Sequence, residues 1–302
     1  MEQYAIVRKT AREFAEAEIM PHSKQIDERS IFPKELFRKM GSLGLLGVHL
    51  PEEFEGGELD VASLLIILEE LSKVSASTGA LLSAHTALAS SILEKFGSAA
   101  IKERYLPSFS KGTRFATLAY TDNITGVSEP YYSLRVSPVD DSYVLNGTKS
   151  MVLGGVLSDV FLVIGVMNSQ PLLFLLDRAS KGLQIGPEIR TLGLRGIGFC
   201  KLTFDDCALP QDALVGSLEN GSSIIRQISI NIRLALSAVS LGLLEAAKSA
   251  SLAYANSRVQ FGKPIGRFEA IQEMIGTMVA DAEVARSYLS SLATRVSREK
   301  DV

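Results

Sequence analysis

The chain has 302 residues, of which 46% are apolar and 22% are charged. These fractions are typical of globular proteins and exclude a disordered or collagen-like chain. The net charge of −3 gives no electrostatic reason to expect nucleic acid as a partner. The only cysteines are Cys200 and Cys207, and their spacing matches neither a disulfide framework nor a metal site, so we expect no metal.

The N-terminal segment 1–18 carries charges in every turn and lacks the apolar region of a secretory leader. The longest apolar stretches, such as 234–244, fall short of the roughly 18 residues that a membrane span requires. We therefore expect a cytoplasmic protein without a membrane span.

Residues 1–112 are predicted to form an N-terminal helical domain. Ile6, Phe14 and Ile19 recur near the helix period, and Pro21 is expected to end the first helix. Further helices are predicted near 34–40, 60–74, 78–96 and 98–106. His85 lies on an apolar helical segment and is interpreted as a core or pocket-lining histidine.

Residues 113–218 are predicted to form a middle domain, an antiparallel β-barrel or sandwich. Short β-branched and aromatic runs with turn signals between them favour this architecture, and the absence of βαβ alternation argues against a Rossmann fold. Asn146-Gly147 predicts a two-residue hairpin turn between strands at 142–146 and 148–153. Other strands are expected at 115–121, 132–138, 159–167, 171–177, 183–189 and 200–206.

Residues 219–302 are predicted to form a C-terminal helical domain, a partial bundle of two long helices. Apolar residues step by three or four from Ile225 to Leu243, which indicates one helix to about Arg258. A second helix follows from about 267. Both are apolar over much of their girth and need partners on more than one side. The fold class is therefore α+β.

The order of these parts and several strings resemble the acyl-CoA dehydrogenase family of flavoproteins. The most specific string is Tyr254-Ala-Asn-Ser-Arg-Val-Gln-Phe-Gly-Lys-Pro-Ile265, against a family pattern YxxxRxxFGxPI. The others are Leu192-Gly-Leu-Arg195, Leu202 to Pro210, Leu145-Asn-Gly-Thr-Lys149 and Leu50 to Gly57. The resemblance extends over nearly the whole chain.

The resemblance implies an FAD enzyme that removes the α-proton of an acyl-CoA thioester with a carboxylate while the β-hydride passes to the flavin. Because the α-proton is weakly acidic, the base must be a carboxylate whose proton affinity is raised by desolvation. The family further implies an acyl-CoA substrate, a homo- or hetero-oligomer (dimer or tetramer) and an electron-transfer flavoprotein as a possible partner.

The resemblance also implies the cofactor residues. Thr121 aligns with a residue at the flavin ring edge, and Gly126 with one that lets the backbone approach phosphate. Met151 and Leu153 stand where the family has a Trp-x-Thr that packs on the flavin.

Arg258, Gln260 and Phe261 align with residues that meet the FAD pyrophosphate and adenosine of a neighbouring subunit. The two cofactor stretches are therefore expected to clasp FAD jointly across two chains. Substrate contacts are expected from Val127, Ser128 and Arg233.

No catalytic base can be assigned. In most of the family it is a glutamate in a downstream Tyr-Glu-Gly-Thr string that is not among these 302 residues. In a minority it immediately precedes the arginine aligned with Arg233, and that position is Ile232 here. Two alternatives therefore stay open: a degenerate, non-catalytic subunit of a heteromeric complex, and a related flavin oxidase or monooxygenase.

Overall fold

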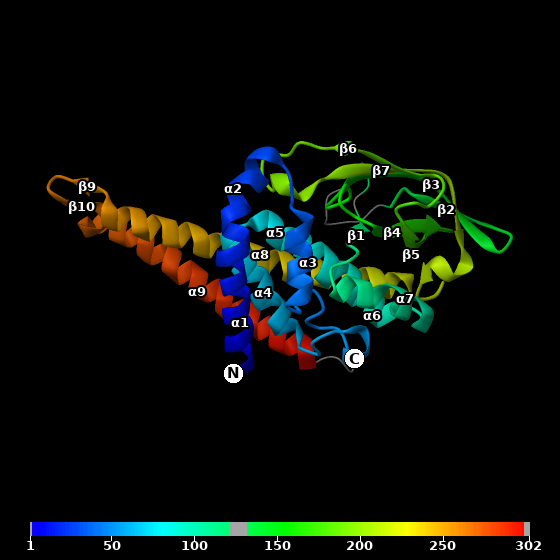
Figure 1. Cartoon of the computed structure of the whole chain (residues 1–302), viewed down its shortest axis with the longest axis horizontal. Helices are drawn as coiled ribbons and strands as arrows, with labels where there is room; N and C mark the ends of the chain where they lie inside the picture. Colours follow the sequence, from blue (N-terminus) through cyan, green and yellow to red (C-terminus); the bar gives the residue numbers. More distant parts are fainter. Residues whose placement is uncertain (1, 121, 123–131, 299–302) are drawn as a thin grey trace.

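In a computed structural model, which describes residues 2–120, 122 and 132–298, a β-sheet part stands between two helical parts of the chain. The N-terminal helices lie in the middle of the molecule and the sheet lies at one end, while two long C-terminal helices reach out to the other end (Figure 1). This arrangement confirms the predicted α+β class.

The N-terminal helices pack around a shared apolar cluster, to which α8 and α9 of the C-terminal part also contribute. The helix predicted to end at Pro21 runs on to Arg29, so that prediction is wrong. A π-helical turn shifts the hydrogen bonding so that Pro21 falls in the first turn of α2, where its missing N–H is not needed. The helical segments are α1 (Glu2–Phe14), η1 (Ala15–Ile19), α2 (Met20–Arg29), α3 (Lys34–Ser42), η2 (Glu52–Phe54), α4 (Val61–Val74), α5 (Ala76–Leu82), η3 (Ser83–Ser90), α6 (Ser91–Phe96) and α7 (Ala99–Ser110).

The strands form one sheet in the order β6-β7-β3-β2-β4-β5-β8, with β1 pairing β4. Most pairs are antiparallel, as predicted, but β1 runs parallel to β4. The bounds are β1 (Ala116–Ala119), β2 (Arg135–Val139), β3 (Ser142–Val152), β4 (Val160–Met167), β5 (Gln170–Asp177), β6 (Leu183–Glu188), β7 (Cys200–Pro210) and β8 (Leu214–Val215). The short turns η4 (Arg195–Ile197) and η5 (Gln211–Ala213) flank β7.

Strand β4 is buried on both faces. Phe161 and Val163 belong to the apolar cluster that strands β3, β5 and β7 share, whereas Val160, Leu162 and Ile164 belong to the cluster between the sheet and helices α6 and α7. The continuous apolar run of this strand is therefore the signature of burial on two sides.

The predicted hairpin turn at Asn146-Gly147 is wrong, because both residues lie inside the single strand β3. Gly147 has φ +135°, and the pairing with β7 shifts register between Leu145 and Gly147. The Asn146 side chain bonds Asp206 twice, at 2.9 Å to its carboxylate and 2.8 Å from its backbone N–H. The glycine thus accommodates a β-bulge in one continuous strand.

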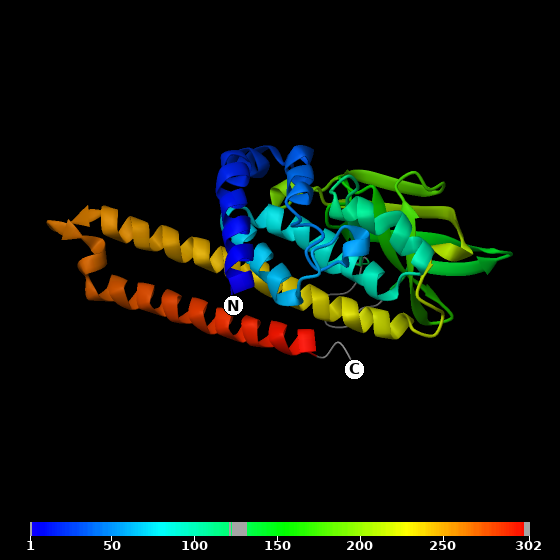
Figure 2. The ribbon, with the colours of Figure 1, turned by 60° about the horizontal axis from the view of Figure 1, so that its bottom comes forward.

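The C-terminal part is a long helical hairpin. Helix α8 (Gly221–Ser257) runs from the sheet past the N-terminal helices and continues beyond them, and α9 (Glu269–Arg298) returns beside it (Figure 2). The tip between them holds β9 (Val259–Gln260), β10 (Lys263–Pro264) and η6 (Ile265–Arg267). Both long helices lie where the sequence predicts them.

By length and hydropathy alone, α8 is the one helix among the described residues that could cross a membrane. Core helices of folded domains meet the same criteria. Residues of α8 belong to the apolar cluster of the N-terminal helices and to the cluster beneath the sheet, and this packing accounts for part of the hydropathy of the helix.

A buried network of charges joins the hairpin to the N-terminal helices. Glu69 of α4 accepts from Arg8 of α1 at 3.0 Å and from Arg286 of α9 at 2.9 Å. Arg286 also pairs with Glu245 of α8 at 3.0 Å. Burial raises the pKa of Glu69, but the hydrogen bonds from Arg8 and Arg286 outweigh it and hold that pKa below its ordinary value.

The neighbouring Glu70 extends this network. Its carboxylate binds Arg8, Arg12 at 3.2 Å and Lys73 at 2.7 Å, and its side chain is almost fully buried. Because each carboxylate meets several cations, the network compensates the desolvation of both acids. Four helices from both ends of the sequence are thereby fixed to one another.

His85 is fully buried, in agreement with its interpretation as a core histidine. Its Nδ1 accepts from the Ala116 N–H at 3.1 Å, so Nε2 carries the proton and donates to the Phe109 carbonyl at 3.1 Å. Burial lowers the pKa of His85 to about 4. This neutral ring links η3, α7 and the start of β1.

We expect Glu69→Ala to destabilise the protein by about 3 kcal/mol, because it removes the buried carboxylate that Arg8 of α1 and Arg286 of α9 share and leaves each cation with fewer partners. The free energy of unfolding in urea measures this. Lys9→Ala is the control, since Lys9 forms an exposed pair with Glu13 and should change stability by less than about 0.5 kcal/mol. Equal losses in the two variants would contradict the role of the network.

The pH dependence of stability tests His85. Its folded pKa of about 4 lies below the unfolded value of 6.5, so the unfolded chain binds the extra proton between these pH values. The contribution, about 3 kcal/mol in full, is present above pH 6.5 and is lost as pH falls towards 4. Urea midpoints should therefore fall less steeply over this range in His85→Gln than in the wild type. The wild-type slope should persist in the control His22→Gln, and a parallel fall in all three proteins would refute this account.

Candidate functional site

The ends of β1 and β3 lie side by side and form the candidate flavin-facing edge of the sheet. The Thr117 hydroxyl donates to the Leu153 carbonyl at 2.6 Å. The Lys149 ammonium lies 3.4 Å from the Tyr120 carbonyl. This edge flanks position 121. The predicted contacts Thr121, Gly126, Val127 and Ser128 lie outside the described residues.

Met151 and Leu153 differ in how they present their side chains at this edge. Met151, near the end of β3, is 42% exposed. Leu153 is half-buried and packs against the apolar cluster of the N-terminal helices. Met151 is therefore the better placed of the two to lie against an external ring, and a thioether suits such a contact.

A buried ion pair holds the two strand ends together. Lys149 Nζ lies 2.6 Å from Asp122 Oδ1, and both side chains are almost completely buried. The other Asp122 oxygen accepts from the Ser133 backbone N–H. Burial lowers the pKa of Lys149, and Asp122 opposes that shift. In the sequence Lys149 is recognisable only as part of a motif and Asp122 carries no signal, because their contact joins residues 27 positions apart.

Two tyrosines complete this edge. The rings of Tyr120 and Tyr132 meet edge to face at 5.7 Å, and the Lys149 ammonium lies 5.2 Å from the centre of the Tyr132 ring. Burial and the hydrogen bond with Tyr120 raise the pKa of Tyr132. The Tyr132 phenol therefore stays neutral, and its ring and that of Tyr120 together form an apolar wall of this edge.

The α8 positions expected near a substrate show no proton acceptor. Ile232 is half-buried against the cluster beneath the sheet. Arg233 is exposed, and its side chain makes no ion pair within the described part of the chain. Two residues before Arg233, the Asn231 amide donates to the Ala87 carbonyl at 2.7 Å and ties α8 to η3.

The buried carboxylates are also unsuited to proton abstraction. Among the described residues they are Glu69, Glu70, Asp122 and Glu245, and each is paired with a cation. For Glu245, burial raises the pKa, but Lys248 and Arg286 outweigh it and lower it below the ordinary value. A carboxylate that acts as a general base needs a pKa raised above its ordinary value.

The hairpin tip presents Arg258, Gln260 and Phe261 to solvent. Phe261 is 92% exposed and adopts φ +49°, which is unusual for an aromatic residue. Its ring meets that of Phe268 edge to face, with ring centres 6.2 Å apart. The tip and the sheet stand at opposite ends of the molecule (Figure 1), so one chain does not bring its tip to the sheet, in which β3 carries Met151.

Comparison with known proteins identifies this architecture. The family model "Acyl-CoA dehydrogenase, N-terminal domain" matches residues 1–113, the corresponding middle domain matches 117–207, and the C-terminal domain matches 220–302. The chain belongs to the acyl-CoA dehydrogenase family. The resemblance predicted from the sequence strings is thereby confirmed.

Similarity to individual proteins supports this family assignment. The short-chain specific acyl-CoA dehydrogenase of Clostridium acetobutylicum is 32% identical over 93% of this chain and 76% of its own length. The butyryl-CoA dehydrogenase structure from Megasphaera elsdenii has a TM-score of 0.95 and 27% identity, covering 99% of this chain and 81% of that one. A structure described as electron transferring flavoprotein of Acidaminococcus fermentans, in work on flavin-based electron bifurcation, has a TM-score of 0.96 and 30% identity, covering 99% and 80%.

The contribution of the buried Lys149–Asp122 ion pair to the stability of the protein can be tested by mutation. Lys149→Met leaves a buried carboxylate without its cation and should destabilise the protein by about 3–5 kcal/mol. In the double variant Lys149→Met/Asp122→Asn the carboxylate is absent, so a large part of that loss should be recovered. Urea unfolding of the wild type, both single variants and the double variant measures the coupling. Additive losses would show that the pair is not coupled.

Proposed function

We propose that this chain is an FAD-binding acyl-CoA dehydrogenase subunit that acts on a short acyl-CoA thioester. Membership of the family and the short-chain and butyryl-CoA relatives support this assignment. FAD, when bound, accepts the hydride from the β-carbon. The chain's own residues hold and orient the cofactor and the thioester and exclude water.

The observation that carries the proposal is the hairpin tip. An exposed phenylalanine at positive φ is unfavourable unless something covers it. Phe261 offers a stacking face for adenine, and the nearby Arg258 offers a bidentate donor for pyrophosphate. Gln260 adds an amide on the same turn. The donor set at the tip therefore fits a dinucleotide, and the exposed Met151 at the sheet edge fits the ring end of that cofactor.

The cofactor site requires two chains in this proposal. The tip does not approach the sheet of its own chain, so the sheet edge of one subunit would receive the tip of another. Large apolar residues on both hairpin helices support such an assembly, since each is between 41% and 70% exposed: Leu236, Leu243, Leu252, Tyr254, Met274, Val279, Val284 and Tyr288. Exposed large apolar residues in this number on two paired helices favour a protein interface. A homo-oligomer is the simplest assembly with this geometry.

The acyl group would lie beneath the sheet edge, where Tyr120, Leu88 and Ile232 each pack, partly buried, against the same apolar cluster. Thr121, Gly126, Val127, Ser128 and Arg233 stay predicted contacts to the cofactor or the thioester. An electron-transfer flavoprotein is the proposed electron acceptor, and the cytoplasm is the proposed location, supported by similarity to bacterial relatives of this family.

A second candidate function is a non-catalytic subunit that binds the same ligands. Ile232 cannot accept a proton, and the four buried carboxylates are paired with cations. A chain of this kind would hold FAD and acyl-CoA without oxidising the thioester. Anaerobic addition of butyryl-CoA to the FAD-loaded protein separates the two functions, because a dehydrogenase bleaches the flavin absorbance and a non-catalytic subunit leaves it unchanged.

Cofactor binding itself is tested at the hairpin tip. We expect Arg258→Ala and Phe261→Ala each to raise the dissociation constant for FAD about tenfold or more, measured by quenching of flavin fluorescence. Arg267→Ala, an exposed arginine on the same hairpin, is the matched control and should bind FAD as the wild type does. Size-exclusion chromatography shows whether each variant keeps its assembly. Unchanged FAD affinity in both tip variants would rule out this site.

A further inference from the structure

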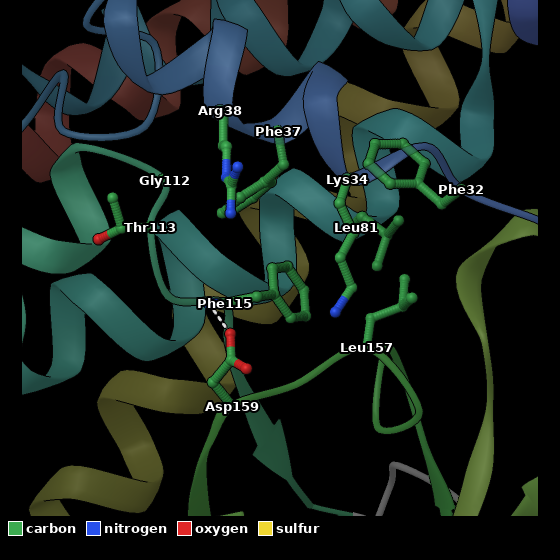
Figure 3. Close-up of a pocket in the computed structure, with 10 residues that line it drawn as sticks. All are labelled: Phe32, Lys34, Phe37, Arg38, Leu81, Gly112, Thr113, Phe115, Leu157 and Asp159. Carbon is green, nitrogen blue, oxygen red and sulfur yellow. Dashed lines mark hydrogen bonds between the residues drawn. The ribbon is translucent and has the colours of Figure 1, made fainter.

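A cavity outside the proposed flavin site opens between the N-terminal helices and the sheet. Its walls come from α3 and α5 on one side, and from the segments that lead into β1 and β4 on the other (Figure 3). Its volume is about 160 Å³, close to that of a cavity of about 150 Å³ known to hold benzene. The space therefore suits a group the size of one six-membered ring.

The floor of the cavity is apolar and firmly held. It is formed by Phe32, Phe37, Leu81, Phe115 and Leu157. The rings of Phe37 and Phe115 meet edge to face at 5.1 Å, and Phe115 stacks at 5.4 Å on the buried ring behind it, that of His85. Because these rings fix one another, the floor is preformed, and it offers edges and faces to an aromatic or branched aliphatic group.

Two cations reach into the cavity from α3. Lys34 and Arg38 stand one helical turn apart, and Figure 3 shows both side chains directed inward over the apolar floor. Neither forms an ion pair within the described residues. The only acid in the lining is Asp159, and one of its oxygens accepts from the Phe115 N–H at 2.9 Å. Two cations and one anion leave the lining with a net charge of +1.

We propose that this cavity binds a small monocarboxylate with an apolar body of about ring size, such as an aryl or branched alkyl acid. The carboxylate lies between Lys34 and Arg38 at the mouth, and the apolar body lies on the phenylalanine and leucine floor. A single negative charge neutralises the lining, whereas a dianion exceeds it. The floor excludes carboxylates that lack an apolar body, because they bury no hydrophobic surface.

Occupancy joins the two parts of the molecule that line the cavity. The bound acid contacts α3 from the helical part and Phe115 at the start of the sheet part, so it stabilises their junction. The site is independent of the proposed flavin chemistry, because neither Lys34 nor Arg38 belongs to the cofactor or thioester contacts. Loss of carboxylate binding and loss of FAD binding are thus separately measurable.

Calorimetric titration at low salt tests the proposal with three probes: benzoate, its neutral isostere benzamide and acetate. Benzoate is expected to bind with a dissociation constant on the order of 1 mM, as for a ligand of this size. Benzamide and acetate should each bind at least tenfold more weakly, because one lacks the charge and the other the ring. Equal binding of benzoate and benzamide would refute the role of the cations.

Variants locate the site. Lys34→Ala/Arg38→Ala should weaken benzoate binding at least tenfold while FAD binding stays unchanged. Thr113→Trp, at the exposed rim, should block the cavity with both cations kept. Lys24→Ala/Arg29→Ala removes two exposed charges from the neighbouring α2 and should bind benzoate as the wild type does. Circular dichroism verifies that each variant is folded. Wild-type affinity in both cavity variants, or equal loss in the α2 control, would overturn the proposal.

Discussion

The buried acids of α4 fix the position of the whole C-terminal hairpin. Glu69 and Glu70 follow one another in the sequence, and together they bind cations from α1, α4 and α9. Arg286 also forms an ion pair with Glu245 of α8, so α8 belongs to the same network. Apolar packing alone permits helices to slide along one another, whereas charge pairs with defined donors fix their register. The long reach of the hairpin beyond the body depends on this anchor, because its distal half has no support from its own chain (Figure 2).

At the other end of the molecule, polar groups in an apolar surrounding fix how the strands end. Lys149 and Asp122 join the ends of β3 and β1, and His85 joins the start of β1 to α7 and η3. In each case a buried polar side chain forms its ion pair or hydrogen bonds with elements that are distant in the sequence. The sheet edge that would meet a flavin ring is therefore built from contacts that are rigid before any ligand binds, which lowers the entropic cost of binding.

Most of the fold can be predicted from the sequence because its periodicity is strong. The two long C-terminal helices and the sheet between helical parts follow from apolar spacing. The errors occurred where local chemistry admits two outcomes. Proline can end a helix or occupy its first turn. Because the π-helical turn η1 precedes it, Pro21 occupies the first turn of α2. Asn-Gly can form a hairpin turn or a β-bulge. Because β3 pairs with β7 on both sides of Gly147, this glycine lies in a β-bulge.

The site was less predictable than the fold, for a physical reason. Arg258, Gln260 and Phe261 could be recognised because a conspicuous string carries them, and their exposure fits a role outside their own chain. The Lys149–Asp122 pair and the cations over the Phe37 and Phe115 floor could not be recognised, because charged residues in a sequence carry no sign of which of them will be buried or directed into a cavity.

A cofactor site divided between a sheet edge and a remote hairpin tip couples assembly to ligand binding. In the proposed assembly neither half alone would surround a dinucleotide, so the affinity for FAD would depend on the concentration of assembled subunits as well as on the residues at the site. Filling the site in turn stabilises the assembly, since a ligand held by two chains links them. The exposed ring of Phe261 is then understandable in an otherwise well-packed protein. In the proposed oligomer this ring would be buried, and its burial would stabilise both the interface and the bound cofactor.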